Sequence, residues 1–147
     1  MDLGADIFIG GLPSPETLKA AVAQAYSVPA SRVAIRRAET PWPDADVVLE
    51  YINENGVIPG DYPIQLLPWG PADRTDEPST LTALSITLKA PILTSSDSHD
   101  PLDMELYLPD GAMYRVSVDQ EANGGIRNTT IMRRLIEQHA RPNAMAS

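Results

Sequence analysis

The sequence contains no cysteine, and this absence excludes several kinds of chemistry at once. A chain without thiols forms no disulfide, holds no metal through thiolates and uses no cysteine nucleophile. It also lacks any hydrophobic run near the ~20 residues that a membrane-spanning helix needs. The first residues, Met1 to Asp6, are acidic where a secretory signal starts with basic residues. We therefore expect a cytoplasmic protein.

Basic residues are scarce: 11 lysines and arginines face 20 acids, which gives a net charge of −9 and a pI near 4.5. This excess of negative charge argues against nucleic acid or an anionic membrane surface as a partner. It permits a basic protein partner. An acidic surface also serves solubility alone, so the charge by itself leaves both interpretations open.

A chain of 147 residues with 43% hydrophobic residues is long enough for one domain with its own core. We expect that domain to span residues 1–141, followed by a mobile tail over 142–147. The order of the expected elements favours an α+β fold. In it, a mixed, mostly antiparallel sheet carries two or three helices on one side, and a C-terminal hairpin precedes the last helix.

Residues 102–118 form the clearest local pattern, because two alternating apolar and polar runs flank Pro109, Asp110 and Gly111. A two-residue loop would place Leu106 opposite Arg115. A three-residue loop instead places Leu106 opposite Tyr114, Met104 opposite Val116 and Glu105 opposite Arg115, so that apolar side chains share one face. We choose the three-residue loop, in which Gly111 takes the positive φ that closes the turn.

The start of the chain predicts a strand, a helix and a second strand. Residues 5–10 read as a short buried strand and residues 32–36 as another. Between them Ser14 is expected to cap a helix that has Pro15 at its first position. The apolar face of this helix comprises Leu18, Ala21, Val22 and Ala25. The three elements suggest a βαβ or split βαβ unit.

Residues 39–78 differ from the rest, since they hold seven of the 14 prolines, both tryptophans and nine acids against one arginine. Within them we expect a strand over 46–52 and an edge strand over 63–67, where Pro63 would be tolerated. Residues 80–90 fit both a helix and a strand. We favour the helix, capped by Ser79 or Thr80, because the strand expected over 91–94 needs a connector before it.

The last helix is expected to begin after Asn128 as its cap. We assign Ile131, Met132, Leu135 and Ile136 to its apolar side and Arg127, Arg133, Arg134 and Arg141 to its basic side.

No motif for a catalytic centre, a metal or a cofactor stands out, so we expect a protein that is not an enzyme and that needs none of these. Ser95, Ser96, His99 and Asp100 are the residue types of a hydrolytic triad, but such groups normally converge from distant positions. We expect a polar loop whose side chains cap backbone groups. The acids of the same loop lack the spacing of a calcium site, and Gly10-Gly11 is too short for a phosphate-binding loop. His139 is expected at the surface, near a helix end.

The acidic middle segment is the strongest candidate for a binding surface. Tryptophan and tyrosine are enriched at interface hot spots, acidic rims speed association with a basic partner, and prolines reduce the ordering needed on binding. The alternative is that Trp42 and Trp69 belong to the core. The candidate binding residues are Trp42, Asp44, Asp46, Glu54, Asp61, Tyr62, Trp69, Asp73, Asp76 and Glu77.

The two ends of the chain resemble the small acidic immunity proteins that are encoded beside bacterial polymorphic toxins. The resemblance is carried by Ile7 to Ile9, Thr17 to Ala25, Val33 to Ile35, Ala90 to Asp97, Leu106 to Gly111 and Arg115 to Asp119. It does not extend to the acidic middle, and no family residue is transferred by position. It implies a non-catalytic bacterial protein that binds a cognate toxin, which we expect to be basic, and blocks its active site. A small-ligand-sensing domain is the alternative, and a hydrolase ranks lowest.

Overall fold

The computed structural model describes residues 6–37, 40–52, 58–70, 77–96 and 98–140. Within these ranges the elements are, in chain order, β1 (Ile7–Ile9), α1 (Pro15–Tyr26), η1 (Ala30–Arg32), β2 (Val33–Arg36), β3 (Val47–Tyr51), β4 (Ile64–Trp69), α2 (Glu77–Leu88), β5 (Ile92–Ser95), β6 (Asp103–Tyr107), β7 (Met113–Ser117), β8 (Asp119–Gln120), β9 (Ile126–Arg127) and α3 (Thr130–His139).

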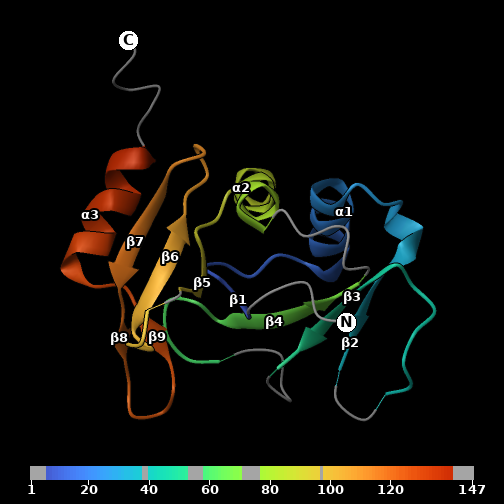
Figure 1. The fold of residues 1–147 in the computed structure, drawn as a ribbon, viewed down its shortest axis with the longest axis horizontal. Coiled ribbons are helices and arrows are strands. Elements are labelled where there is room, and N and C mark those ends of the chain that lie inside the picture. The colour runs from blue at the N-terminus through green and yellow to red at the C-terminus, as the bar shows by residue number, and fades with distance from the viewer. Residues whose placement is uncertain (1–5, 38–39, 53–57, 71–76, 97, 141–147) are drawn as a thin grey trace.

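Seven strands form one mixed sheet in the order β2-β3-β4-β1-β5-β6-β7, and β8 pairs with β9 separately. Only β2 and β3 are parallel neighbours. Helices α1 and α2 lie side by side over one face, here called the inner face, while α3 lies by β6 and β7 against the other, outer face (Figure 1). The predicted α+β class is confirmed. The expectation that all helices lie on one side is wrong for α3, because the apolar residues of the hairpin face outward.

The first strand, helix and second strand form as predicted. Ser14 caps α1 by accepting a hydrogen bond from the Thr17 N–H at 3.1 Å, and Pro15 occupies the first turn. Strands β1 and β2 run in the same direction but are separated by β3 and β4 in the sheet. The arrangement is therefore the split form of the βαβ unit.

Strand β4 lies in the interior of the sheet, between β3 and β1, so its prediction as an edge strand is wrong. Pro63 precedes the strand and interrupts no pairing. Pro68 lies inside it, opposite Leu49. The Ile52 N–H donates to the Gln65 carbonyl, and hydrogen-bonded pairs alternate with non-hydrogen-bonded pairs along an antiparallel ladder, so the Pro68 nitrogen points away from β3. On the other side, β1 begins opposite Leu66 and does not extend to Pro68. The missing N–H is thus harmless.

Residues 80–90 are helical, as favoured, but α2 begins at Glu77, so neither Ser79 nor Thr80 caps it. Leu81 and Leu84 are buried against α1 and the sheet. Ser85 is buried as well, and its hydroxyl donates to the Ala90 carbonyl at 2.7 Å. This bond satisfies a polar group that the strand alternative would have placed in solvent. Lys89, with φ of 54°, ends the helix.

The hairpin register is confirmed residue by residue. Leu106 lies opposite Tyr114, Met104 opposite Val116 and Glu105 opposite Arg115. The Leu108 N–H donates to the Ala112 carbonyl at 2.9 Å, which closes a loop of three residues, and Gly111 has a φ of 95°. The apolar face of the hairpin packs into a core cluster under α3.

Helix α3 is capped by Thr129, not by Asn128 as predicted. The Asn128 side chain instead accepts a hydrogen bond from the Tyr62 hydroxyl. Met132 is fully buried and Leu135 and Ile136 partly so, whereas Ile131 is 69% exposed and does not belong to the apolar side. Arg127 lies in β9, while Arg141 and the tail over 142–147 fall outside the described residues.

Two core clusters lie on opposite faces of the sheet. The inner cluster joins α1 and α2 to residues such as Ile9, Leu49 and Leu66, and the outer cluster joins α3 to Leu106 and Val116. No helix among the described residues is long and apolar enough to cross a membrane.

Replacing Gly111 by valine is expected to lower the free energy of unfolding by about 1–3 kcal/mol, because a β-branched residue is strained at positive φ. Gly11→Ala is the control: its Cβ would meet Ala90 at an ordinary 3.5 Å. Urea denaturation of the two variants measures the difference. A Gly111→Val midpoint equal to that of the wild type would contradict the strain argument.

Candidate functional site

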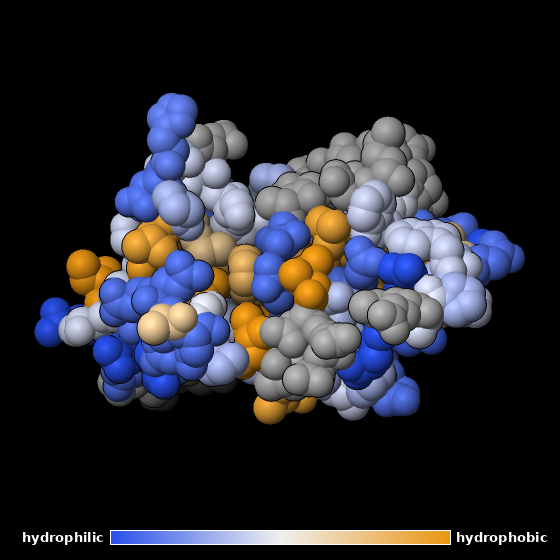
Figure 2. Space-filling view, turned by 90° about the horizontal axis from the view of Figure 1, so that it is seen from below, coloured by the Kyte–Doolittle hydropathy of each residue, from blue (hydrophilic) through white to orange (hydrophobic). Residues whose placement is uncertain are grey.

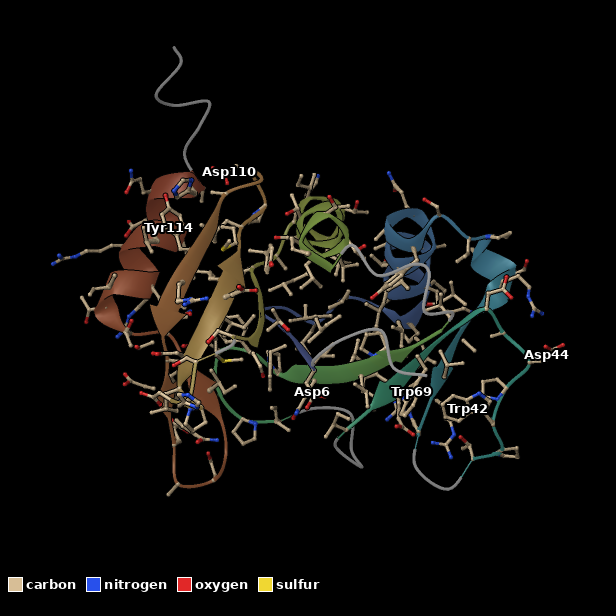
Figure 3. The ribbon with its side chains drawn as sticks, in the orientation of Figure 1. Asp6, Trp42, Asp44, Trp69, Asp110 and Tyr114 are labelled. Atoms are coloured by element: carbon tan, nitrogen blue, oxygen red, sulfur yellow. The ribbon has the colours of Figure 1, made fainter. Side chains whose placement is uncertain are left out.

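The predicted binding tryptophans come together where β2, β3 and β4 lie side by side. Val47, Leu49 and Tyr51 of β3 point into the inner core. Strand alternation therefore turns Glu50 to the outer face, beside Arg36 of β2, its register partner. Trp69 at the end of β4 shares that face, and the loop before β3 brings Trp42 beside it (Figure 3).

Four side chains form a connected cluster, here called the Trp42 cluster: Arg36, Trp42, Glu50 and Trp69. The two indole rings meet edge to face, with centroids 5.6 Å apart and planes at 87°. The Arg36 guanidinium lies 4.9 Å from the centre of the Trp42 ring and forms an ion pair with Glu50. The Trp69 Nε1–H donates to Glu50 Oε1 at 3.3 Å. Each ring therefore has two polar or aromatic restraints on its orientation.

Trp42 is nevertheless 53% exposed, while Trp69 is only partly exposed. A large aromatic side chain held in one orientation while half of it faces solvent is typical of an interface anchor, because little side-chain entropy remains to be lost on binding. Figure 2 shows the molecule from below, where apolar residues lie interspersed with hydrophilic ones. Between interface and core, the structure places Trp42 at the surface.

The acids near the cluster are paired with arginines. Arg32 reaches both Asp44 and Asp46 at 3.3 Å, and these two hydrogen bonds raise the pKa of Arg32 further. Asp44 stays open to solvent, with 96% of its side chain exposed. Arg36 likewise pairs with Glu50. Asp44, Asp46 and Glu50 therefore each have an arginine partner, so these three acids are not the unpaired acidic patch that the composition indicated.

Asp61 and Tyr62 belong to a different place. Tyr62 is completely buried, and its hydroxyl donates to Asn128 Oδ1 at 2.6 Å. Burial raises the pKa of Tyr62, and the neighbouring Asp61 carboxylate adds to the shift. Asp61 accepts a hydrogen bond from the Asn128 N–H at 2.8 Å. Both residues thus hold the segment before α3, and the buried Tyr62 cannot be the surface contact that we predicted.

The remaining predicted binding residues cannot be placed. Glu54, Asp73 and Asp76, together with the side chain of Glu77, lie outside the described residues. Conversely, Arg36 and Glu50 were not predicted from the sequence as partners of the tryptophans. Alternation along the two strands places both side chains on the outer face. They meet only because β2 pairs in parallel with β3, and no local sequence pattern predicts that pairing.

The loop between β5 and β6 has the capping role that we expected. Ser96 donates to the Asp103 carbonyl at 2.9 Å, and the Asp100 carboxylate accepts the Leu102 N–H at 2.9 Å. Ser98 and Ser117 both donate to the Asp103 carboxylate, at 2.8 Å each, and these bonds lower the pKa of Asp103. The exposed His99 takes part in none of these bonds. In the described part of the loop, these bonds tie β6 to its neighbours and assemble no triad.

The glycines after β1, the acidic side chains and His139 were the other candidate sites. Gly10 donates its N–H to the Pro91 carbonyl at 2.8 Å, and a Cβ there would lie 2.7 Å from the Pro91 ring, so this glycine serves close packing. Among the residues that the structure describes, no group of three or more histidine or acidic side chains could hold a metal ion. His139 lies at the end of α3 as expected, but it bridges Asp110 and Tyr114.

In the part of the chain that the structure describes, two surface hollows are lined without any charged residue. The larger, about 380 Å³, lies between α2 and the hairpin, with Ile86 and Met113 at its mouth. The smaller, about 140 Å³, lies by Phe8 and Met104. Ligand sites usually combine apolar walls with a few convergent polar groups, so these two hollows do not favour a small polar ligand.

Neither a scan of protein-family models nor searches of curated proteins and solved structures finds a match to this chain.

Asp103 is expected to contribute to the acid sensitivity of the fold. Its folded pKa lies below the unfolded value of about 3.9, so its stabilising contribution is present above that pH and is lost as the pH falls through the folded pKa. Between pH 5 and pH 2, roughly, Asp103→Asn should therefore lose less stability than the wild type. Urea midpoints across this pH range measure the loss of stability. Ser117→Ala, which removes one of the two hydroxyl bonds to Asp103, should lose an intermediate amount. Parallel curves for all three proteins would contradict the assignment.

Trp42→Ala is expected to lower the free energy of unfolding by only about 1–2 kcal/mol, the sum of an edge-to-face aromatic pair and a partly exposed cation–π contact. Leu106→Ala is the core control, because Leu106 is fully buried, and it should lose about 2–5 kcal/mol. Denaturant unfolding compares the two. If both variants lose the same amount, Trp42 is a core residue.

Proposed function

We propose that this chain is a non-catalytic, protein-binding inhibitor, an immunity protein that neutralises a cognate bacterial toxin by covering its active site or substrate cleft. The Trp42 cluster carries the proposal. A half-exposed tryptophan, oriented by Trp69 and Arg36, is an anchor for a protein surface. Tryptophan and arginine are also the residues most enriched among hot spots.

The geometry changes the role that we give to the acids. In the described part of the surface, Asp46 and Glu50 are occupied by arginines, so they position the cluster. Asp44 also pairs with Arg32, but 96% of its side chain is exposed, so it is the acid best placed to meet a cation of the partner as well. The overall charge of −9 then favours encounter with a basic toxin, while the aromatic anchor supplies the lifetime of the complex.

The ligand-sensing alternative gains little support. The two hollows described above have mainly apolar linings and no charged group that could orient a polar ligand. The hydrolase alternative gains little support either, because Ser96, Ser98, Asp100 and Asp103 of its loop are engaged with the backbone and with each other. The inhibitor therefore remains the function that the described surface favours.

The test compares three baits in affinity capture from the native host: the wild type, Trp42→Ala and Leu12→Ala. Leu12 is the matched control, an apolar side chain that is 68% exposed in the turn before α1. We expect one protein to bind the wild type and Leu12→Ala. We expect Trp42→Ala to bind it with a free energy weaker by about 2 kcal/mol, or roughly 30-fold in Kd.

The captured protein is then expressed alone and together with each bait. Growth arrest by that protein, relieved by the wild type and by Leu12→Ala but not by Trp42→Ala, is the expected result. A captured protein that does not arrest growth would refute the immunity function. Equal protection by all three baits would instead remove Trp42 from the interface.

A further inference from the structure

Three polar side chains form a hydrogen-bonded chain between the tip of the hairpin and the end of α3. Asp110 Oδ2 lies 2.5 Å from His139 Nδ1, and His139 Nε2 lies 2.7 Å from the Tyr114 hydroxyl. The tyrosine and imidazole rings are 5.4 Å apart, edge to face. Figure 3 shows Asp110 at the hairpin tip and Tyr114 on the side of the hairpin where α3 lies. Here this arrangement is called the Tyr114 relay.

The direction of each hydrogen bond follows from the groups themselves. An ionised carboxylate only accepts, so His139 Nδ1 must carry the proton that faces Asp110. In neutral imidazole Nε2 is then the acceptor, and the Tyr114 hydroxyl donates to it. Partial burial raises the pKa of Asp110, but hydrogen bonds from the Ala112 N–H and from His139 outweigh this and keep it below its ordinary value. Asp110 therefore fixes the tautomer in which His139 can take the tyrosine proton.

We propose that Tyr114 is a nucleophilic site for covalent transfer from a donor with a tetrahedral phosphorus or sulfur centre and a leaving group. His139 acts as the general base and Asp110 as a positioning residue. The arrangement meets the geometric requirement for an activated nucleophile: nucleophile to base, and base to orienting group, both within hydrogen-bond distance.

The transfer step balances as a simple substitution. A lone pair of the Tyr114 oxygen forms the bond to phosphorus or sulfur, and the leaving group departs with the electron pair of its own bond. The hydroxyl proton passes to His139 Nε2, and the resulting imidazolium is stabilised by the Asp110 carboxylate. Solvent then takes the proton from His139. No oxidant, reductant or metal takes part.

The exposure of the site allows such a reaction. The side chains of His139 and Asp110 are 18% and 29% exposed, and Tyr114 is partly exposed. The other four tyrosines of the chain, Tyr26, Tyr51, Tyr62 and Tyr107, are buried. The Tyr114 relay also lies on β7 and α3, at the opposite end of the strand order from the Trp42 cluster. The Tyr114 relay is therefore separate in the fold from the surface that carries the proposed inhibitor function.

The probe is an arylsulfonyl fluoride, which has a tetrahedral sulfur centre and a fluoride leaving group. The folded protein is incubated with it, and the rate of sulfonylation at each tyrosine is followed by peptide mass spectrometry. We expect Tyr114 to be modified first. His139→Gln should slow this reaction about tenfold or more, because a general base typically contributes 10²–10⁴-fold in enzymes and less at an open site.

If exposure alone determined the labelling rate of Tyr114, removing His139 would not slow it. If Tyr114 reacted merely because it is accessible, His139→Gln would label as fast as the wild type or faster, and the proposal would fail. His139→Ala with imidazole added to the solution should regain labelling, which a purely structural role of His139 would not allow. Failure of imidazole to restore the rate would also count against the proposal.

Two further variants test the positioning role and the fold. Asp110→Glu keeps a carboxylate and should retain more labelling than Asp110→Asn. Equal labelling of the two would remove Asp110 from the relay. In every variant the buried Tyr62 reports on folding, because it becomes reactive only when the chain opens. Slow sulfonylation of Tyr114 while Tyr62 stays unlabelled then shows that activation of Tyr114 is lost and that the fold is kept.

Discussion

The pairing of β1 with both β4 and β5 is the interaction on which the rest of the fold depends. This strand has only three residues, Ile7 to Ile9, yet it joins β2-β3-β4 on one side to β5-β6-β7 on the other. Ile7 and Ile9 are buried in the core under α1 and α2, while Phe8 contacts the opposite core. Such a short strand can hold two half-sheets together because its side chains alternate between two hydrophobic clusters.

This organisation places the two candidate functional surfaces, the Trp42 cluster and the Tyr114 relay, in different halves of the sheet. The Trp42 cluster belongs to the half with β2 to β4, where alternation leaves arginine, glutamate and tryptophan on the outer face. The Tyr114 relay belongs to the other half, where the hairpin register places Tyr114 on the side that α3 covers. An aromatic anchor with paired charges suits protein binding, whereas a tyrosine, histidine and aspartate in one hydrogen-bonded chain suit proton transfer.

Charge plays a different part in the structure than composition indicates. The chain is strongly acidic, but the described acids around Trp42 are paired with Arg32 and Arg36. Pairing turns a set of repelling carboxylates into a scaffold that orients an aromatic ring. The net negative charge then acts at long range on the rate of encounter, while short-range contacts of the ring act on the lifetime of a complex.

The sequence by itself determined what depends on neighbours along the chain. The hairpin register, the Ser14 cap and the helix favoured over residues 80–90 are local, because turn geometry, capping and periodicity act over a few residues. The expectation that Trp42 and Trp69 mark a surface also came from sequence, although it included the buried Tyr62. Only the tertiary structure decided the interior position of β4, the side on which α3 lies, and the meeting of Arg36 with Glu50 and of His139 with Asp110 and Tyr114. Each of these depends on which distant strands pair and which face a helix covers, and that choice is set by the burial of apolar surface in the whole molecule.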